Sequence, residues 1–217
     1  MIRVVVVDDE ALVRSGFTMI LQAAGDIRVV ATATGADAER EIALARPDVV
    51  LLDIRMPGVD GLTVLDRVLA AGDAPAVAML TTFDTDEYIE QALAAGASGF
   101  LLKDTDPDQL VQSVRALAAG AVVLSPGAAR PVVGGRLSAD RRAAERDVAA
   151  LTDRERDVLA LVSEGLSNAE IGRELYLSPS TVKDHVSTLL GKLGVTSRVR
   201  AALLAQLAGL RRPGDDA

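Results

Sequence analysis

The stretch VVLLDIRMPGVDG, from Val49 to Gly61, decides the fold of this chain. Four apolar residues run directly into Asp53, and Pro57, Gly58 and Gly61 then interrupt any regular structure. A short apolar run bounded by turn residues is typical of a buried strand in a parallel sheet. Asp53 is therefore expected at the carboxyl end of a strand, where open α/β sheets hold their ligands. An isolated acid at that place would more often cap the next helix.

Asp53 is not isolated, because other strand-like runs also stop on polar residues. Residues 2–7 stop on Asp8, Asp9 and Glu10, residues 77–80 on Thr81 and Thr82, and residues 100–102 on Lys103. A weaker strand at 29–31 and helix-length amphipathic stretches at 10–24, 35–45, 62–71, 85–95 and 107–119 complete five βα units. This alternation predicts an α/β doubly wound, five-stranded parallel sheet of the flavodoxin-like order 2-1-3-4-5.

The predicted strand order brings the polar residues to one edge of the sheet. The ends of the first and third strands flank the switch point, so Asp8, Asp9 and Asp53 meet there, with Thr81 and Lys103 within reach. Three carboxylates without Cys or His suit a hard divalent cation, most plausibly Mg²⁺. A carboxylate can also act as a nucleophile and form an aspartyl phosphate, while a lysine and a hydroxyl bind phosphoryl oxygens. The set predicts a phosphoryl-accepting pocket.

These residues, together with Met56-Pro57-Gly58 and the segment AGASGFLLKD (residues 95–104), resemble the receiver domain of bacterial response regulators over the first half of the chain. The resemblance implies that Asp53 is the phospho-acceptor and that Asp8, Asp9, Asp53 and the backbone carbonyl of Arg55 bind Mg²⁺. It also implies that Thr81 and Lys103 contact the phosphoryl group and that Phe100 is the aromatic switch residue. Many relatives carry Tyr at that last position, so activation through a phenolic hydrogen bond is not available to Phe100.

Composition narrows the class of protein. The 217 residues are 49% hydrophobic and include no Cys, which excludes a disulfide framework, a thiolate metal site and a cysteine nucleophile. No apolar run approaches the ~18 residues of a membrane span and no signal-peptide pattern opens the chain, so we expect a cytoplasmic protein without a membrane partner. The first 120 residues carry 9 Lys and Arg against 19 Asp and Glu, whereas residues 151–217 carry nine of each. The overall charge of −8 therefore does not argue against DNA binding by the second half.

The chain divides into four predicted parts. Residues 1–120 form the α/β domain, and residues 121–150 form a linker in which Ser125-Pro126 starts a possible short helix. Residues 151–210 form a small all-α domain of four helices, and residues 211–217 form a disordered tail. Two capping boxes, Thr152–Glu155 and Ser167–Glu170, open the first two helices of the second domain. Ser178-Pro179 opens the third helix and Ser197 the fourth, which gives a helix-turn-helix arrangement.

The third helix has an apolar and a polar face. Its apolar stripe comprises Val182, Val186, Leu189, Leu190 and Leu193, and the opposite face is short-chained and polar. Unaided, such a bundle is as consistent with a protein-interaction module as with DNA binding. The segment from Leu151 to Val195 resembles the LuxR-type helix-turn-helix, and with the receiver it resembles the NarL/FixJ family of response regulators. The resemblance implies that Lys183, Asp184 and Ser187 face base edges, and that Thr181, His185, Lys192 and Arg198 contact the DNA backbone.

The sequence thus predicts a regulator of a two-component system. A cognate sensor histidine kinase would phosphorylate Asp53, and the protein would release its recognition helix and bind double-stranded promoter DNA as a homodimer. Dimerisation is expected through Val199, Ala202 and Leu203 of the last helix. No enzymatic activity is expected beyond phosphorylation and dephosphorylation of Asp53 itself. Two alternatives stay open: a phosphatase that turns over external phosphate esters, and a module whose helical domain binds protein.

Overall fold

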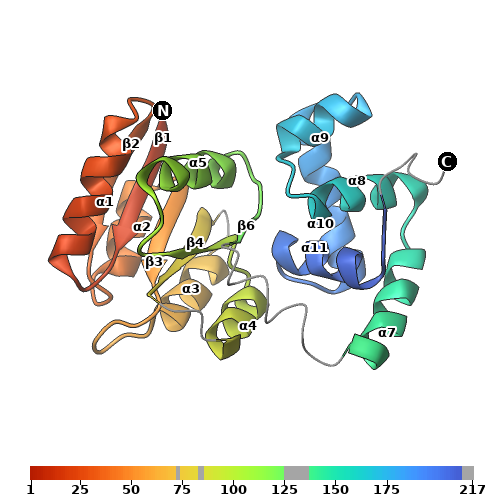
Figure 1. Ribbon diagram of the computed structural model, residues 1–217, viewed down its shortest axis with the longest axis horizontal. Helices are drawn as coiled ribbons and strands as arrows, with labels where there is room; N and C mark the ends of the chain where they lie inside the picture. Colours follow the sequence, from red (N-terminus) through yellow and green to blue (C-terminus); the bar gives the residue numbers. More distant parts are fainter. Residues whose placement is uncertain (72–73, 83–85, 125–136, 212–217) are drawn as a thin grey trace.

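The chain forms two domains in the computed structural model (Figure 1). The structure describes residues 1–71, 74–82, 86–124 and 137–211. We refer to residues 1–124 as the N-terminal domain and to residues 137–211 as the C-terminal domain. The possible helix at Ser125-Pro126 and the predicted disordered tail beyond Arg211 lie outside the described residues. In the described part of the chain, no helix has both the length and the apolar character that crossing a membrane requires.

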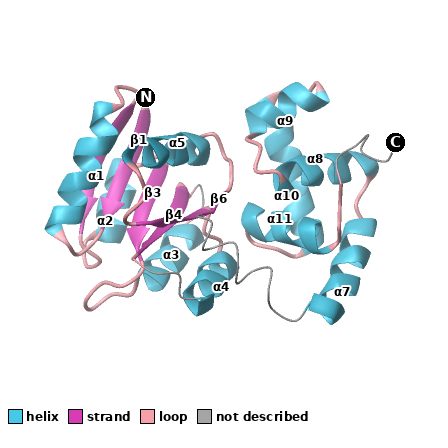
Figure 2. Ribbon diagram, in the orientation of Figure 1, coloured by secondary structure: helices cyan, strands magenta, loops and turns pink. Residues whose placement is uncertain are grey.

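The N-terminal domain is a parallel sheet with helices on both faces (Figure 2). Its elements follow in the order β1 (Ile2–Val7), α1 (Ala11–Ala23), β2 (Ile27–Ala33), α2 (Ala38–Ala45), β3 (Val49–Asp53), α3 (Gly61–Ala70), β4 (Ala76–Thr81), α4 (Asp86–Ala95), β5 (Gly99–Leu102), α5 (Pro107–Ala118) and β6 (Val123–Leu124). The strand order is β2-β1-β3-β4-β5-β6. This confirms the predicted doubly wound fold and the order of its first five strands.

The sequence did not predict the sixth strand. The sequence places residues 121–124 in the linker, because Pro and Gly punctuate the segment that follows. In the structure Val123 and Leu124 pair in parallel with Gly99 and Phe100 and extend the sheet beyond β5. Gly99 allows this approach, since a Cβ there would lie 2.7 Å from the carbonyl oxygen of Val123.

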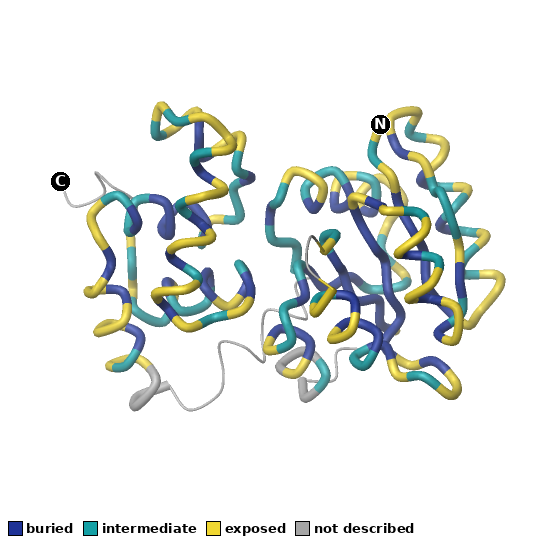
Figure 3. The backbone as a smooth tube through the Cα atoms, turned by 180° about the vertical axis from the view of Figure 1, so that it is seen from behind, coloured by how far each residue is buried: buried dark blue, intermediate teal, exposed yellow. Residues whose placement is uncertain are grey.

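Alternating residues of each central strand face two separate cores, which appear as buried segments in Figure 3. Val5 and Val7 of β1 pack with α2, α3 and α4 on one face, whereas Val4 and Val6 pack with α1 and α5 on the other. Every residue of β3 is buried. Burial on both faces explains why the central strands read as unbroken apolar runs and why their ends are the places where polar side chains reach solvent.

The C-terminal domain is a helical bundle formed by α7 (Leu137–Ala149), α8 (Asp153–Ser163), α9 (Asn168–Leu175), α10 (Pro179–Leu193) and α11 (Arg198–Leu207). Both predicted capping boxes are present with their reciprocal hydrogen bonds. The expected linker is partly helical, because α7 packs Val148 into the same core as Ala201 and Ala205 of α11. The apolar stripe of α10 is buried in this core, apart from the half-buried Leu190.

Gly61 is required by a close approach of two backbone segments. A Cβ at this position would lie 2.1 Å from the carbonyl oxygen of Asp53, so the Gly61→Ala variant must displace the loop that follows β3. We expect this variant to lower the free energy of unfolding of the N-terminal domain by about 1–3 kcal/mol. Gly191→Ala in α10 is the matched control, because open space surrounds that position, and it should raise stability by roughly 0.5–1 kcal/mol. Urea unfolding followed by circular dichroism measures both; a neutral effect of Gly61→Ala would contradict the steric explanation.

Candidate functional site

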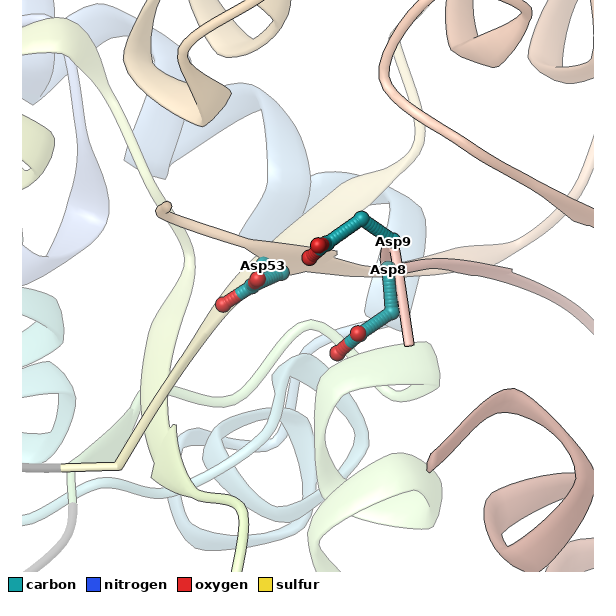
Figure 4. A group of neighbouring side chains, drawn as sticks. All are labelled: Asp8, Asp9 and Asp53. Carbon is teal, nitrogen blue, oxygen red and sulfur yellow. The ribbon is translucent and has the colours of Figure 1, made fainter. Parts of the chain in front are cut away.

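The carboxyl ends of four adjacent strands lie at the same edge of the sheet, and the predicted site residues are located there. Asp8 and Asp9 follow β1, Asp53 ends β3, Thr81 ends β4 and Lys103 follows β5. Figure 4 shows the carboxylates of Asp8, Asp9 and Asp53 converging from two neighbouring strands. One oxygen from each of these carboxylates lies within 4.8 Å of the other two. The predicted acidic cluster therefore exists as a spatial group.

The acidic cluster has the donor set that a hard cation prefers. Asp8 is fully buried, Asp53 is 4% exposed and Asp9 is exposed, so the cluster reaches from the interior to solvent. Carboxylate oxygens at this spacing fit Mg²⁺, whose charge would offset their mutual repulsion and bridge to a phosphoryl oxygen. The residues present therefore fit the ion.

Lys103 supplies the counter-charge within the protein itself. Its Nζ lies 2.9 Å from Asp8 Oδ2, 3.1 Å from Asp53 Oδ2 and 3.4 Å from Glu10 Oε1. Burial disfavours the charge, but the hydrogen bonds from Lys103 to Asp8 and Asp53 outweigh it and raise the pKa of this ammonium group. Lys103 therefore stays cationic and links the two buried carboxylates.

Asp53 is held in an environment that disfavours its ionised form. Burial raises its pKa to about 6, even though the hydrogen bond and the charge of Lys103 act in the opposite direction. The nearby charge of Asp8 adds to the increase, and a backbone hydrogen bond from Arg55 opposes it. The predicted nucleophile is thus mostly ionised at neutral pH but poorly stabilised, so its charge is available to an incoming cation or phosphorus centre.

Arg14 was not predicted, yet it fixes the loop that carries two of the acids. Its Nη1 donates to the carbonyl oxygens of Asp8 at 2.6 Å and Asp9 at 3.0 Å. The backbone N–H of Glu10 in turn donates to Asp8 Oδ1 at 2.9 Å. An arginine four residues into a helix carries no signal in the sequence for this role, because only the turn of the chain brings its side chain back to the loop.

Of the two predicted switch residues, Thr81 ends β4 at the edge of the sheet where the acidic cluster lies, and Phe100 lies in the core. Thr81 is 9% exposed at the end of β4, and its carbonyl oxygen accepts the Lys103 backbone N–H at 2.8 Å. Phe100 is 1% exposed in the core between the sheet and α4.

The predicted DNA-contacting residues of α10 divide into exposed and half-buried groups. Lys183, Asp184 and Ser187 are exposed on its polar face, whereas Thr181 and His185 are half-buried. Val186 and Leu189 on the opposite face are buried in the domain core. The short helix α9, the turn and the longer helix α10 form the expected helix-turn-helix.

Two further residues expected on the DNA backbone are engaged inside the domain. Lys192 Nζ lies 2.8 Å from Oε1 of Glu155 and, with the capping-box bond from Thr152, lowers the pKa of that carboxyl to about 2. Arg198 donates to the carbonyl oxygen of Leu166 and to Oδ1 of Asn168, and its burial lowers the pKa of its guanidinium to about 10. Both cations hold helix ends in place, which a charge count along the sequence does not reveal.

Each half of the chain matches a known protein family. Residues 4–115 match the response regulator receiver domain, and residues 149–205 match the LuxR family of bacterial regulatory proteins. The chain belongs to the LuxR-family response regulators. The nitrate/nitrite response regulator NarL of Escherichia coli K12 is 39% identical over 92% of this chain and 93% of its own length. The transcriptional activator DevR/DosR of Mycobacterium tuberculosis is 37% identical over 99% of both chains.

A solved structure resembles this chain over nearly its whole length. The response regulator ChrA of a heme-sensing two-component system has a TM-score of 0.53 and 37% identity, and the match covers 96% of this chain and 98% of ChrA. The protein is thus a two-component response regulator whose receiver and LuxR-type domains imply regulation of transcription.

The two domains of this response regulator contact each other through α4 and α11. Thr196 Oγ1 donates to the carbonyl oxygen of Ala94 at 2.9 Å, and Ser197 Oγ donates to that of Leu93 at 3.3 Å. These carbonyls belong to the last turn of α4, where helices leave acceptors without an internal partner. Val199 of α11 is fully buried in the receiver core that also contains Phe100. Sequence patterns do not predict this contact, because its partners are 102 and 104 residues apart.

The pKa of Asp53 predicts how stability depends on pH in the absence of Mg²⁺. Because the folded-state pKa of this carboxyl lies above its unfolded value, its stabilising contribution is complete below about pH 4 and is lost as the pH rises through 6. The Asn side chain of Asp53→Asn does not ionise, so this variant does not lose stability as the pH rises. Its free energy of unfolding should exceed that of the wild type by about 2 kcal/mol at pH 8. Urea unfolding in EDTA between pH 4 and pH 8 measures the difference. An advantage of the variant that is largest at low pH would contradict the assignment.

Proposed function

We propose that this response regulator receives a phosphoryl group on Asp53 from a sensor histidine kinase in the bacterial cytoplasm. The observation that carries the proposal is the convergence of Asp8, Asp9 and Asp53 at the ends of adjacent strands, with Lys103 bonded to Asp8 and Asp53. Asp8, Asp9, Asp53 and the carbonyl oxygen of Arg55 would hold Mg²⁺. The bound ion supplies positive charge for the phosphoryl oxygens and for the carboxylates.

Each residue of the pocket has a separate part in the transfer. The Asp53 carboxylate is the nucleophile, and its poorly stabilised charge favours attack on an electrophilic phosphorus. Lys103 already touches Asp53 Oδ2 and can pair with a phosphoryl oxygen that replaces it. The Thr81 hydroxyl donates to a second phosphoryl oxygen. Phe100 repacks in the core beneath, which shifts an existing equilibrium between two conformations.

We propose no enzymatic activity beyond phosphorylation and dephosphorylation of Asp53. The hydrolysis of an external phosphate ester would require the acceptor to be regenerated at each turnover. A receiver that acts as a switch instead keeps the aspartyl phosphate long enough to change its DNA-bound state.

On the output side, we propose that α10 enters the major groove of promoter DNA. Lys183, Asp184 and Ser187 are placed to read base edges, and Thr181 and His185 lie beside them toward the phosphate backbone. Lys192 and Arg198 are assigned to the structural roles described above. One helix-turn-helix offers few phosphate contacts, so a homodimer on a two-fold site supplies the affinity.

We propose that activation uncovers the dimer face and not the recognition helix. Release of the recognition helix was expected, but its base-reading residues are already exposed. The receiver covers part of the proposed dimer face: Val199 of α11 is buried in the receiver core and Leu203 packs against it, whereas Ala202 is buried in the core of the C-terminal domain itself. We propose that phosphorylation detaches α4 from α11 and thereby frees this face for a second copy.

Intact-mass measurement after incubation with acetyl phosphate and Mg²⁺ tests the input. We expect one added phosphoryl group on the wild type and none on Asp53→Asn, because Asp53 contacts Lys103 and retains 4% exposure, whereas Asp8, the other buried carboxylate of the cluster, is fully buried. Asp60→Asn is the matched control: Asp60 lines the same loop but serves as the N-cap of α3, a role that Asn also fills. Phosphorylation of Asp53→Asn, or its loss in Asp60→Asn, would contradict the assignment of the acceptor.

Removing the hydroxyl of Thr196 tests whether the contact between α4 and α11 restrains the unphosphorylated protein. Thr196→Val deletes the hydrogen bond to Ala94 without touching the N-cap of α11, which is Ser197. We expect about a two- to tenfold increase in DNA affinity of the unphosphorylated protein, since one hydrogen bond contributes about 0.5–1.5 kcal/mol. Thr18→Val, which deletes a hydroxyl bond inside α1, should leave affinity unchanged. Fluorescence anisotropy on promoter DNA gives the affinities. An unchanged affinity for Thr196→Val would refute the proposal that the contact between α4 and α11 restrains DNA binding.

A further inference from the structure

A hollow opens beside the phospho-acceptor. Its volume is about 400 Å³, and its lining comprises Asp9, Ile54, Arg55, Met56, Pro57, Asp60 and Tyr88. Asp9 belongs to the acidic cluster, and Ile54 to Pro57 directly follow Asp53. A volume of this size accommodates a small molecule. In phosphoryl transfer the leaving group lies on the side of the phosphorus atom opposite the nucleophile. When Asp53 attacks the donor, the leaving group therefore needs space outside the acidic cluster, and the hollow offers such space.

One cation lies in the wall of this hollow and is stacked on an aromatic ring. Among the described lining residues only Arg55 is cationic, and its guanidinium carbon lies 5.1 Å from the centre of the Tyr88 ring. This distance is that of a cation–π contact. Arg55 belongs to the loop after β3, whereas Tyr88 belongs to α4. The Arg55 side chain is exposed and long, so without the ring it would sample many rotamers away from the hollow.

We propose that Tyr88 is a positioning residue for phosphoryl transfer: it holds the guanidinium of Arg55 at the wall of the hollow, facing the leaving group of an acyl phosphate donor. The inference rests on the proposed function of Asp53 and adds a residue to it. Tyr88 touches neither the acceptor nor the donor in this role. It acts by restricting the guanidinium of Arg55 to the wall of the hollow, where the positive charge faces the leaving group.

The two donors release leaving groups of different charge. When an Asp53 oxygen attacks the phosphorus of acetyl phosphate, the bond from phosphorus to the bridging oxygen breaks. Its electron pair stays on acetate, which leaves as an anion without needing a proton. The positive charge of Arg55 stabilises this developing anion. With phosphoramidate the phosphorus–nitrogen bond breaks instead, and the nitrogen, already protonated, leaves as neutral ammonia. Arg55 therefore favours the first donor over the second.

The test is the ratio of phosphorylation rates with acetyl phosphate and with phosphoramidate, followed by intact mass in the presence of Mg²⁺. Both donors use the same acceptor, acidic cluster and lysine, so general damage to the pocket cancels in the ratio. We expect Tyr88→Leu to lower the ratio about two- to fivefold. Tyr88→Phe, which keeps the ring, should retain the wild-type ratio. Tyr176→Leu makes the same change at the other tyrosine of the chain, in the C-terminal domain, and should have no effect.

Arg55→Met decides whether the effect passes through the guanidinium. Because Arg55 is exposed, this variant leaves the core intact and gives an answer even if Tyr88→Leu does not fold. It should lower the ratio at least as far as Tyr88→Leu, and the double variant should fall no further than Arg55→Met alone. An unchanged ratio in Arg55→Met, or independent additive effects of the two changes, would overturn the proposal while leaving Asp53 as the acceptor. A wild type that both donors leave unphosphorylated would remove the proposed function and this inference together.

Discussion

The architecture of the site depends on the repulsion between carboxylates that the sheet brings together and on the ammonium group that offsets it. Asp8 and Asp53 are buried at the ends of adjacent strands, and Lys103 lies within about 3 Å of both. Removing one partner from a buried charge pair leaves an uncompensated charge, which costs more than the pair contributes. The sheet order therefore requires a cation after β5 as firmly as it requires acids after β1 and β3.

The same constraint makes the site a switch. Burial keeps the pKa of Asp53 near 6, so its ionised state is held above the free energy it would have in water. A divalent cation or a covalent phosphoryl group changes the charge that Lys103 must satisfy, and Lys103 is bonded through its backbone to Thr81. A change of one ion-pair partner is thus passed to the end of β4, the strand that precedes α4 in the chain. Phe100 and Val199 share the core beneath α4, which carries the change to the other domain.

The sequence predicted those parts of the site that local pattern determines. Asp53 and Lys103 were found because apolar strands that stop on polar residues identify a sheet edge without knowledge of the tertiary structure. The resemblance implies that Lys192 and Arg198 contact the DNA backbone. Within the protein they bond to a capping-box carboxylate and a loop carbonyl, which are far away in the sequence. The domain contact of Thr196 escaped for the same reason: its acceptor lies 102 residues away.

The contacts between α4 and α11 have the magnitude that a phosphorylation switch can use. Two hydroxyl bonds contribute about 0.5–1.5 kcal/mol each, and burial of Val199 about 1.5–3 kcal/mol, before the entropy of domain fixation is subtracted. Moving an equilibrium from 1:99 to 99:1 takes about 5.5 kcal/mol, so a closed state held by these few contacts lies within reach of the charge-assisted bonds that a phosphoryl group forms. Coupling is reciprocal. A second copy or a DNA site that binds only the open form must therefore stabilise the aspartyl phosphate by the same free energy by which phosphorylation favours DNA binding.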